Sequence, residues 1–282
     1  MDIFQLDHKQ VLSILPERDP YSHKGDYGKV LLLCGSRGFT GAATLAAMGA
    51  LRSGAGLVYL AVPECIYQIE ATKLTEPIIY PLPSHDNTYS KEAISFIDNM
   101  MIRKDVVLIG PGIGCNEHTE AVVCHVLKNF NDPVIVDADG INVLKTHKDL
   151  LRGRTSPTIL TPHDGEFLRF GGTLSENRVQ AAMGFAQDLS VILLLKGHRT
   201  IITDGKHCYL NPTGNPGMST GGSGDVLAGM IAGLIGQGIP PLEAAACSAW
   251  LHGAAGDICA IEIGQYGMLP TDMLNVLPRL LK

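Results

Sequence analysis

The chain has little charge and few aromatic residues. Charged residues make up 18% of its 282 residues and aromatic residues 6%, while hydrophobic residues make up 45%. The net charge of −6, with no run of basic residues, argues against nucleic acid as a partner. The hydrophobic share is that of a chain that buries a core, which excludes a disordered protein.

Paired cysteines and long apolar runs are also missing. The seven cysteines are odd in number and none form a CxxC pair, which predicts reduced thiols and excludes a disulfide framework or a zinc site. The first residues carry no basic patch followed by an apolar run, so we expect no secretory signal and a cytoplasmic protein. His252, Asp257 and Glu262 interrupt the least polar stretch, residues 244–263, which predicts a buried helix and no membrane span.

Short apolar segments alternate with helical patterns along the chain, which predicts an α/β fold with a mostly parallel sheet flanked by helices. The predicted strands are residues 30–34, 57–62, 106–109, 134–136, 158–160 and 191–195. The predicted helices are residues 42–53, 117–129, 175–189, 225–235 and 241–259. Asp204-Gly205, between residues 201–203 and 207–210, predicts a tight hairpin and an antiparallel edge. No repeat or linker divides the chain, so we expect a single domain over residues 1–282.

The most informative segment is NPTGNPGMSTGGSGDVLAGMIAGL, in the last quarter of the chain. Gly221, Gly222 and Gly224 crowd a turn there, and a helix is expected to begin near Asp225. Unpaired N–H groups at the start of a helix bind anions, so the turn predicts an anion hole. A carboxylate would repel a bare phosphate, which indicates that Asp225 is a general base acting on a hydroxyl while the amides hold a transferring phosphoryl group. A glycine-rich connection capped by Asp225 is the structural alternative.

Polar motifs also follow other predicted strands, at the edge of the sheet where α/β proteins bind ligands. The glycines of GSRGFTGA and GPGIG suit either tight turns or the close approach of a ligand. Asp137 and Asp139 in DADGIN either hold a hydrated Mg²⁺ or cap the next helix, so the metal ligands stay unassigned. His163 in TPHDGE is either a ligand contact or a structural residue. Lys196 and Arg199 in KGHRT either contact nucleotide phosphates or belong to a solvated turn.

Several familiar catalytic motifs are absent. The chain has no Walker GxxxxGK[ST], no protein-kinase glycine loop with a following lysine, and no pair of histidines at helical spacing. Ser219, Thr220 and Ser223 lack the combination of a nearby His with an Asp that a serine nucleophile needs. We therefore expect their hydroxyls to bind phosphate and not to act as nucleophiles.

Taken together, the motifs resemble the ribokinase-like superfamily and, within it, the NAD(P)H-hydrate dehydratases. The matching segments are KGDYGKVLLLCGS, GAATLAAMGALRSGAGLV, IGPGIG, DADGIN, TPHDGE, KGHRT and NPGMSTGGSGDVLAGMIAGL, over about residues 20–280. The resemblance implies a three-layer sandwich in one domain, without the epimerase module that is fused to some relatives. Asp164 stands where proline is usual and Gly140 where alanine is usual, and both lie beside the implied contacts.

The resemblance also implies an activity and its residues. Hydrated NADH or NADPH would be dehydrated at the expense of ADP, or of ATP, with Mg²⁺ as cofactor and Asp225 as the catalytic base. The implied substrate contacts are Ala42, Gly112, His163 and Asp225. The implied nucleotide contacts are Lys196, Gly197, His198, Arg199, Thr200 and Gly224, and the anion hole comprises Gly221, Gly222, Ser223 and Gly224. Relatives assemble as tetramers, so a homotetramer is expected.

Two other functions stay open. The first is a small-molecule kinase of the same fold, such as a hydroxymethylpyrimidine phosphate or hydroxyethylthiazole kinase. Those relatives typically have Asn in place of His163, so His163 and the NPGMSTGGSGD segment favour the dehydratase. The second is a nucleotide-binding regulator that has lost catalysis, which would need the amides of the loop but not the base Asp225. The sequence does not indicate whether NADH hydrate or NADPH hydrate is preferred.

Overall fold

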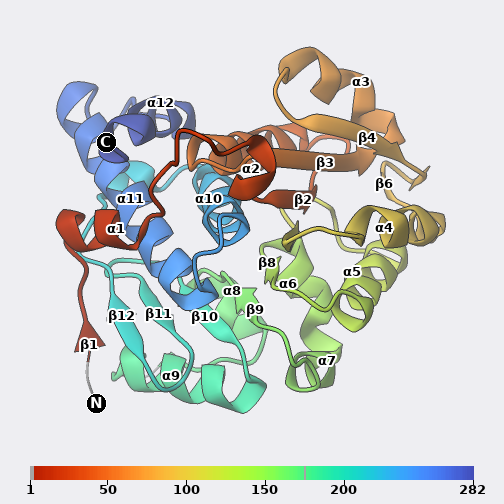
Figure 1. The fold of residues 1–282 in the computed structure, drawn as a ribbon. Helices are drawn as coiled ribbons and strands as arrows, with labels where there is room; N and C mark the ends of the chain where they lie inside the picture. The colour runs from red at the N-terminus through yellow and green to blue at the C-terminus, as the bar shows by residue number, and fades with distance from the viewer. Residues whose placement is uncertain (1–2, 175) are drawn as a thin grey trace.

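The structure is a computed structural model that describes residues 3–174 and 176–282. Its centre is a ten-stranded sheet in the order β1-β12-β11-β10-β9-β8-β7-β2-β3-β4 (Figure 1). Every neighbouring pair is parallel except β10–β11 and β11–β12. The strands are β1 Ile3–Phe4, β2 Lys29–Leu33, β3 Leu57–Pro63, β4 Ile78–Leu82, β7 Val106–Ile109, β8 Val134–Val136, β9 Thr158–Leu160, β10 Ile192–Leu195, β11 Ile201–Thr203 and β12 Cys208–Leu210. A separate hairpin pairs β5 Ser84–His85 with β6 Thr88–Tyr89.

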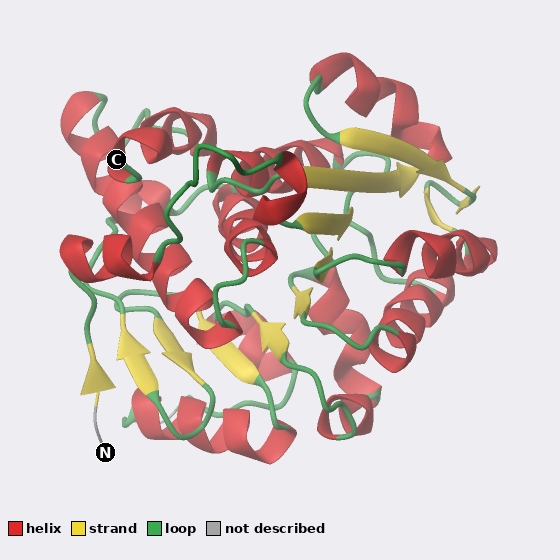
Figure 2. Ribbon diagram, in the orientation of Figure 1, coloured by secondary structure: helices red, strands yellow, loops and turns green. Residues whose placement is uncertain are grey.

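Helices cover both faces of the sheet (Figure 2). They are α1 His8–Ile14, α2 Thr40–Arg52, α3 Glu64–Lys73, α4 Ile94–Met101, α5 Glu117–Asn129, α6 Asp139–Val143, α7 Lys148–Arg152, α8 Asp164–Arg169, α9 Arg178–Leu189, α10 Ser223–Gly236, α11 Pro241–Glu262 and α12 Pro270–Leu280. Side chains of β2 alternate between two cores, because successive residues of a strand point to opposite faces. Val30 and Leu32 pack with residues of α2, α10, α11 and α12, whereas Leu31 and Leu33 pack with residues of α4, α5 and α9. The molecule is therefore a three-layer sandwich.

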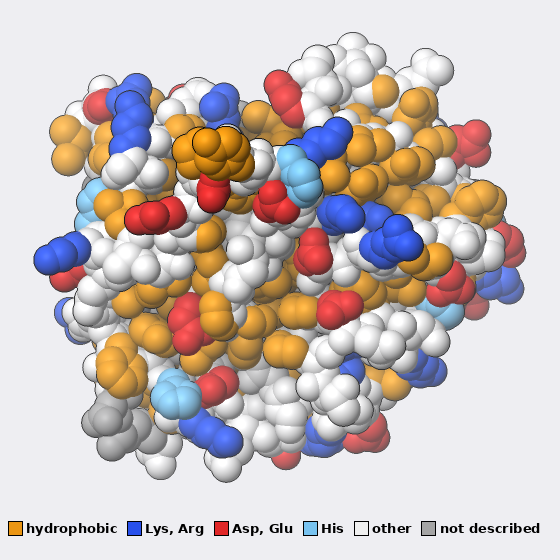
Figure 3. All heavy atoms as spheres, in the orientation of Figure 1, with side chains coloured by type: hydrophobic (Ala, Val, Ile, Leu, Met, Phe, Trp, Pro, Cys, Tyr) orange, Lys and Arg blue, Asp and Glu red, His pale blue; other side chains and the backbone are white. Residues whose placement is uncertain are grey.

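These observations confirm the predicted fold class. All six predicted strands and the hairpin are present, and β1 adds one short parallel strand outside the hairpin. The helix predicted at residues 175–189 begins at Arg178, and Ser175 lies outside the described residues. Across the described ranges, no helix has the length and apolar character needed to cross a bilayer. On the face in Figure 3, acidic and basic side chains are interspersed.

The direction of chain progression reverses at β2. From β2 the sheet grows through β3 to β4 on one side, while β7 pairs on the other side of β2 and starts the series that runs to β12. The loops after β2 and β7 meet there, since the Gly35 amide donates to the Pro111 carbonyl at 2.8 Å. In α/β proteins ligands bind at such a switch point, beyond the carboxyl ends of the strands. The fold thus predicts a site beside these two loops.

Candidate active site

The glycine-rich loop leads into α10 and forms the first turn of that helix. α10 begins at Ser223, two residues earlier than the sequence predicts, with Gly222 as its N-cap and Asp225 in the first turn. The first amides of a helix have no acceptor within the helix, so the amides of Gly224 and Asp225 are available to an anion. The turn therefore combines a carboxylate with the positive end of a helix.

Gly222 is the position in this turn that requires glycine. Gly222 has a φ of 95°, and a Cβ there would lie 2.4 Å from Cδ1 of Leu45 on α2. A Cβ on Gly224 would lie 3.2 Å from Nζ of Lys196, whereas one on Gly221 would meet open space. The Lys196 ammonium consequently lies against the start of α10, on the loop predicted to bind phosphate.

Lys196 is surrounded by carboxylates. Its Nζ lies 2.9 Å from Oδ1 of Asp137 and 4.0 Å from Oε2 of Glu166. The same Asp137 oxygen accepts a hydrogen bond of 2.6 Å from the Thr161 hydroxyl, and Asp137 is only 1% exposed. Burial alone would lower the pKa of Lys196, but Asp137 and Glu166 outweigh burial, so its pKa is raised. Lys196 is therefore a permanent cation at the site.

The carboxyl group of Asp225 is a weaker acid than an ordinary aspartic acid. Burial raises its pKa, the negative charge of Asp137 raises it further, and Lys196 acts in the opposite direction. Asp139 and Glu166 add smaller increases, and the pKa reaches about 6. Such a carboxylate is ionised at neutral pH and accepts a proton more readily than an ordinary one. The role of general base stays a prediction for Asp225, but its surroundings are those that the role needs.

His163 connects the predicted substrate contacts with the predicted nucleotide contacts. Its backbone pairs in parallel with that of Lys196, whose amide donates to the Pro162 carbonyl at 2.8 Å. The ring of His163 caps α8, where Nδ1 accepts from the Gly165 amide at 2.9 Å. The cap uses Nδ1, while Nε2 lies 3.6 Å from Oε1 of Glu166. The structure thus gives His163 a structural role, and its contact with a substrate stays a prediction.

Ala42 and Gly112, two further predicted substrate contacts, meet at the switch point. Ala42 lies in the first turn of α2, and a Cβ on Gly112 would lie 2.9 Å from Cβ of Ala42 and 2.9 Å from Cβ of Phe39. Gly112 is buried, has a φ of 63°, and accepts a hydrogen bond of 2.7 Å from the Ser36 hydroxyl. The absence of a side chain at Gly112 thus lets α2 approach this loop. Contact with substrate stays a prediction for both residues.

Gly112→Ala is expected to lower the free energy of unfolding by about 1–3 kcal/mol, because the new methyl group meets α2 at an unfavourable φ. The KM for the substrate should rise as well, since α2 must move away from the loop. Urea unfolding and steady-state kinetics measure the two effects. Gly184→Ala, on an exposed turn of α9 with no atom within 4 Å, is the control and should be neutral or slightly stabilising. Equal stability of Gly112→Ala and wild type would contradict this packing.

The remaining predicted nucleotide contacts form the turn between β10 and β11. Gly197, His198 and Arg199 are exposed and Thr200 is half-buried. The Thr200 hydroxyl donates to the Gly197 carbonyl at 3.1 Å, which closes the turn. The turn follows Lys196 directly, so it begins beside the start of α10.

The two departures from the family pattern have structural explanations. Asp164 accepts a hydrogen bond of 2.5 Å from Arg178, which also donates to the Lys196 carbonyl at 2.8 Å. Gly140 packs closely on Gly110, since a Cβ on Gly140 would lie 3.0 Å from Cα of Gly110. Asp164 thus braces the start of the turn between β10 and β11 through Arg178.

Asp137 and Asp139 do not cap the next helix. α6 has Ala138 as its N-cap without a side-chain bond, and Asp139 Oδ2 accepts from the Gly114 amide at 2.9 Å. Within the described part of the chain, no three or more His, Cys, Asp or Glu side chains gather as a metal cage. Mg²⁺ commonly takes only one or two carboxylates and fills its shell with waters and substrate phosphates. The carboxylates of Asp137 and Glu166, on either side of Lys196, are a donor set of that kind.

Glu166 and His252 lie at the site although the sequence pattern did not predict either of them there. Glu166 Oε2 accepts from the His163 amide at 2.9 Å, and the spacing of these two residues is that of a capping box, a signal visible in the sequence. His252 Nε2 lies 3.4 Å from Oγ of Ser223 although the two residues are 29 positions apart. No local pattern connects them, so only the structure reveals the contact.

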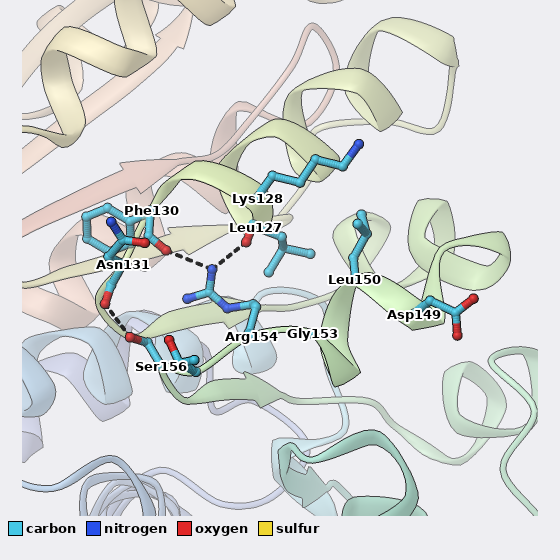
Figure 4. A pocket seen from close by; sticks show the side chains of 10 residues that line it. Leu127, Lys128, Phe130, Asn131, Asp149, Leu150, Gly153, Arg154 and Ser156 are labelled. Atoms are coloured by element: carbon cyan, nitrogen blue, oxygen red, sulfur yellow. Dashed lines mark hydrogen bonds between the residues drawn. The ribbon is translucent and has the colours of Figure 1, made fainter.

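A cavity of about 260 Å³ lies elsewhere, at the amino ends of β8 and β9 (Figure 4). Arg154 projects into it and donates to the carbonyls of Leu127 and Phe130 at 2.6 and 2.8 Å. These carbonyls end α5, so Arg154 satisfies the end of a helix. The cavity lies at the amino ends of the strands, whereas the Lys196–Asp225 site lies at their carboxyl ends. We therefore assign the cavity no part in the chemistry.

Comparison with known proteins agrees with the fold. The structure of an ADP/ATP-dependent NAD(P)H-hydrate dehydratase from Bacillus subtilis, co-crystallised with ATP and Mg²⁺, superposes with a TM-score of 0.85 at 33% identity, covering 99% of this chain and 98% of that one. A hydroxyethylthiazole kinase from Pyrococcus horikoshii, at 16% identity and a TM-score of 0.66, covers 96% and 93% of the two chains and shares the fold alone. The fold is therefore that of a ribokinase-like protein.

Proteins with this fold belong to several families, and the sequence identifies the family of this chain. Residues 30–279 match the family model described as NAD(P)H-hydrate dehydratase, and the chain belongs to this family. It is 46% identical to a bifunctional NAD(P)H-hydrate repair enzyme from Moorella thermoacetica, over 96% of this chain and 52% of that protein. It is 37% identical to the ADP-dependent (S)-NAD(P)H-hydrate dehydratase of Bacillus subtilis, over 97% and 96%. The chain thus spans about half the length of the first of these relatives and nearly all of the second.

Proposed function

We propose that this chain converts hydrated NADH or NADPH back to NADH or NADPH, and that ADP drives the reaction and becomes AMP and phosphate. One observation carries the proposal: Asp225, with a pKa of about 6, lies in the first turn of α10 beside the amides of the glycine loop. Hydroxide is a poor leaving group, whereas phosphate is a good one. Phosphorylating the hydrate hydroxyl therefore makes its removal possible.

In the first step, Asp225 takes the proton of the hydrate hydroxyl, and the hydroxyl oxygen forms a bond to the terminal phosphorus of ADP. The bond between that phosphorus and the bridging oxygen breaks, and AMP leaves with the electron pair. Amides of Gly221 to Gly224 and the Lys196 ammonium stabilise the charge on the transferring group. These groups are pre-organised. The start of α10 holds the amides, and the ion pair with Asp137 holds the Lys196 ammonium.

In the second step, the ring nitrogen supplies an electron pair, the carbon–oxygen bond breaks, and phosphate leaves. Loss of a proton from the neighbouring ring carbon restores the dihydronicotinamide. The sum is hydrate plus ADP to reduced nucleotide, AMP, phosphate and one proton. The oxygen of the original hydroxyl leaves in the phosphate.

Mg²⁺ fits the same site in this proposal. The carboxylates of Asp137 and Glu166 lie beside Lys196 and would hold the ion together with nucleotide phosphates. When bound, the ion would neutralise negative charge on those phosphates. The Bacillus subtilis protein crystallised with ATP and Mg²⁺ supports an adenine nucleotide and this ion as the co-substrate and cofactor.

We further infer a cytoplasmic homotetramer. Ile261, Ile263, Tyr266 and Leu269 are large apolar side chains exposed between the end of α11 and the start of α12. Exposed apolar groups that cluster in this way are typical of contacts between subunits. Light scattering should give four times the mass of the chain, and the mass of a monomer would contradict the inference.

The activity should depend on pH through Asp225. The base works only when ionised, so kcat/KM should be constant above about pH 6 and fall about tenfold per pH unit below it. A pH profile of the wild-type enzyme measures this. The terminal phosphate of ADP ionises in a similar range, so the affinity for ADP should be followed over the same pH values. A rate that stays constant to pH 5 would contradict the proposed base.

Turnover with ADP and with ATP, run side by side, tests the whole proposal. Recovery of the absorbance of reduced nicotinamide from the hydrate, with formation of AMP from ADP, is the expected result. Hydroxymethylpyrimidine phosphate and hydroxyethylthiazole serve as alternative acceptors. A stable phosphorylated product from either of them, with no recovery of NADH, would favour the kinase.

A further inference from the structure

The segment that carries the anion hole is attached to α11. Residues 211–222 connect β12 to α10 and contain only one short 3₁₀ turn, Pro216–Met218. Its internal hydrogen bonds close only short turns, such as the one from the Thr220 amide to the Met218 carbonyl at 2.9 Å. The position of these turns therefore depends on what the segment packs against.

Polar groups at the start of the segment bond to the backbone of α11. The Asn211 side chain donates to the Ala249 carbonyl at 3.1 Å, and the Thr213 hydroxyl donates to the Trp250 carbonyl at 2.9 Å. Gly253 permits this contact, because a Cβ there would lie 2.2 Å from Oγ1 of Thr213. The start of the segment thus lies directly on the helix.

Asp257, one turn further along α11, holds the middle of the segment. Its two carboxylate oxygens accept from the Gly214 amide at 2.9 Å and from the Asn215 side chain at 3.0 Å. Asn215 in turn accepts from the Gly217 amide at 3.0 Å and so caps the 3₁₀ turn. Hydrogen bonds to a charged acceptor are about twice as strong as neutral ones. Asp257 therefore fixes three successive parts of the segment.

His252 lies beneath the anion hole itself. It is buried, and its Nε2 lies 3.4 Å from Oγ of Ser223, the first residue of α10. Burial lowers the pKa of His252 to about 4, with Lys196 contributing in the same direction and a hydrogen bond to the Ser223 backbone opposing it. The ring is neutral at physiological pH, so it supports Ser223 without adding a charge beneath the phosphate site.

We propose that α11 is the platform that sets the geometry of the anion hole, with Asp257 and His252 as positioning residues. The inference rests on the proposed phosphoryl transfer. Neither residue touches the reacting atoms. Asp257 acts through Asn215 and the 3₁₀ turn, and His252 acts through Ser223. Both fix where the amides of Gly221 to Gly224 point.

Asp257→Asn tests the proposal, because the amide keeps the shape and loses the charged acceptor. We expect kcat to fall about 10- to 100-fold, since misplaced oxyanion donors lose transition-state stabilisation. The Kd of ADP, measured by calorimetry, should change less than about threefold, because Lys196 and the turn after it still hold the nucleotide. Glu262→Gln is the matched control. It lies on the same helix, pairs only with Arg279 at the surface among the described contacts, and should leave kcat unchanged.

His252→Phe repeats the test independently, since it keeps a buried ring and removes the nitrogen that faces Ser223. Hydrogen–deuterium exchange over residues 211–225 should accelerate in both variants and not in Glu262→Gln. This readout needs no turnover, so it separates the platform from the dehydratase reaction. No turnover by the wild type would count against the proposed function only. Wild-type kcat and unchanged exchange in both variants would overturn the platform, as would a loss of kcat matched by an equal loss of ADP affinity.

Discussion

Asp225→Asn should abolish turnover while ADP continues to bind. The amide has the shape of the carboxylate but cannot accept the hydroxyl proton, so kcat should fall at least about 10³-fold. Removing a negative charge beside the phosphate site also removes a repulsion, so the affinity for ADP should stay the same or increase. Single-turnover kinetics and calorimetry measure the two quantities.

Asp188→Asn makes the same chemical change at the surface. Asp188 lies at the end of α9 and pairs with Arg152 at 2.8 Å, away from the Lys196–Asp225 site, so this variant should keep wild-type kcat. Near-normal turnover by Asp225→Asn would remove the base assignment. A fall in both kcat and ADP affinity would instead indicate that Asp225 maintains the structure of the site.

Lys196→Met should weaken ADP binding and slow turnover together. The substitution removes the cation that lies against Gly224 and leaves the buried Asp137 without its ion-pair partner, with only the Thr161 hydroxyl still donating to it among the described contacts. Losing a hydrogen bond to a charged group costs about 1.5–3 kcal/mol, which corresponds to an increase in Kd of about 10- to 150-fold. Calorimetry with ADP measures this directly.

The same variant should move the pH profile. Lys196 lowers the pKa of Asp225, so its removal raises that pKa, and kcat/KM should begin to fall at a higher pH than in the wild type. The ionisation of free ADP cannot respond to a change in the protein, so a shift identifies the titrating group as part of the enzyme. Lys206→Met, on the exposed tip of the β11–β12 hairpin, should change neither quantity. Unchanged ADP affinity in Lys196→Met would contradict the proposed nucleotide contact.

The sequence predicts the centre of the fold well, for a physical reason. Strands that are covered on both faces are continuously apolar, and β2, β7 and β10 show that pattern clearly. β4 was not predicted, because it lies at the edge, is largely exposed and contains Pro81. β1 is too short, at two residues, to produce a pattern.

The five predicted helices are all present, with ends that differ by at most about three residues, whereas others, such as α3 and α4, were not predicted. α10 begins two residues before the predicted start, because Gly222 adopts a positive φ that allows it to serve as the N-cap. α12 was not predicted at all. Pro278 lies inside it, and a proline there normally ends or breaks a helix. Packing against α11 and α2 stabilises it there, and local sequence does not encode that contact.

The site was only partly visible in the sequence. Asp225 and Lys196 were predicted individually, from the glycine loop and from a strand end. The effect of Asp137 on both residues was not predicted. Asp137 and Lys196 are 59 residues apart and meet only because β8, β9 and β10 align in the sheet. The contact between Ser223 and His252 is hidden for the same reason.

The fate of the hydroxyl oxygen tests the central claim most directly. Hydrate prepared in ¹⁸O-water and diluted into ordinary water with ADP and the enzyme should yield phosphate that contains one ¹⁸O atom, because the labelled oxygen attacks phosphorus and leaves bound to it. Mass spectrometry of the phosphate, after early time points, measures the label. Label that appears in water while the phosphate stays unlabelled would show that the hydroxyl leaves without phosphorylation, and this would contradict the mechanism.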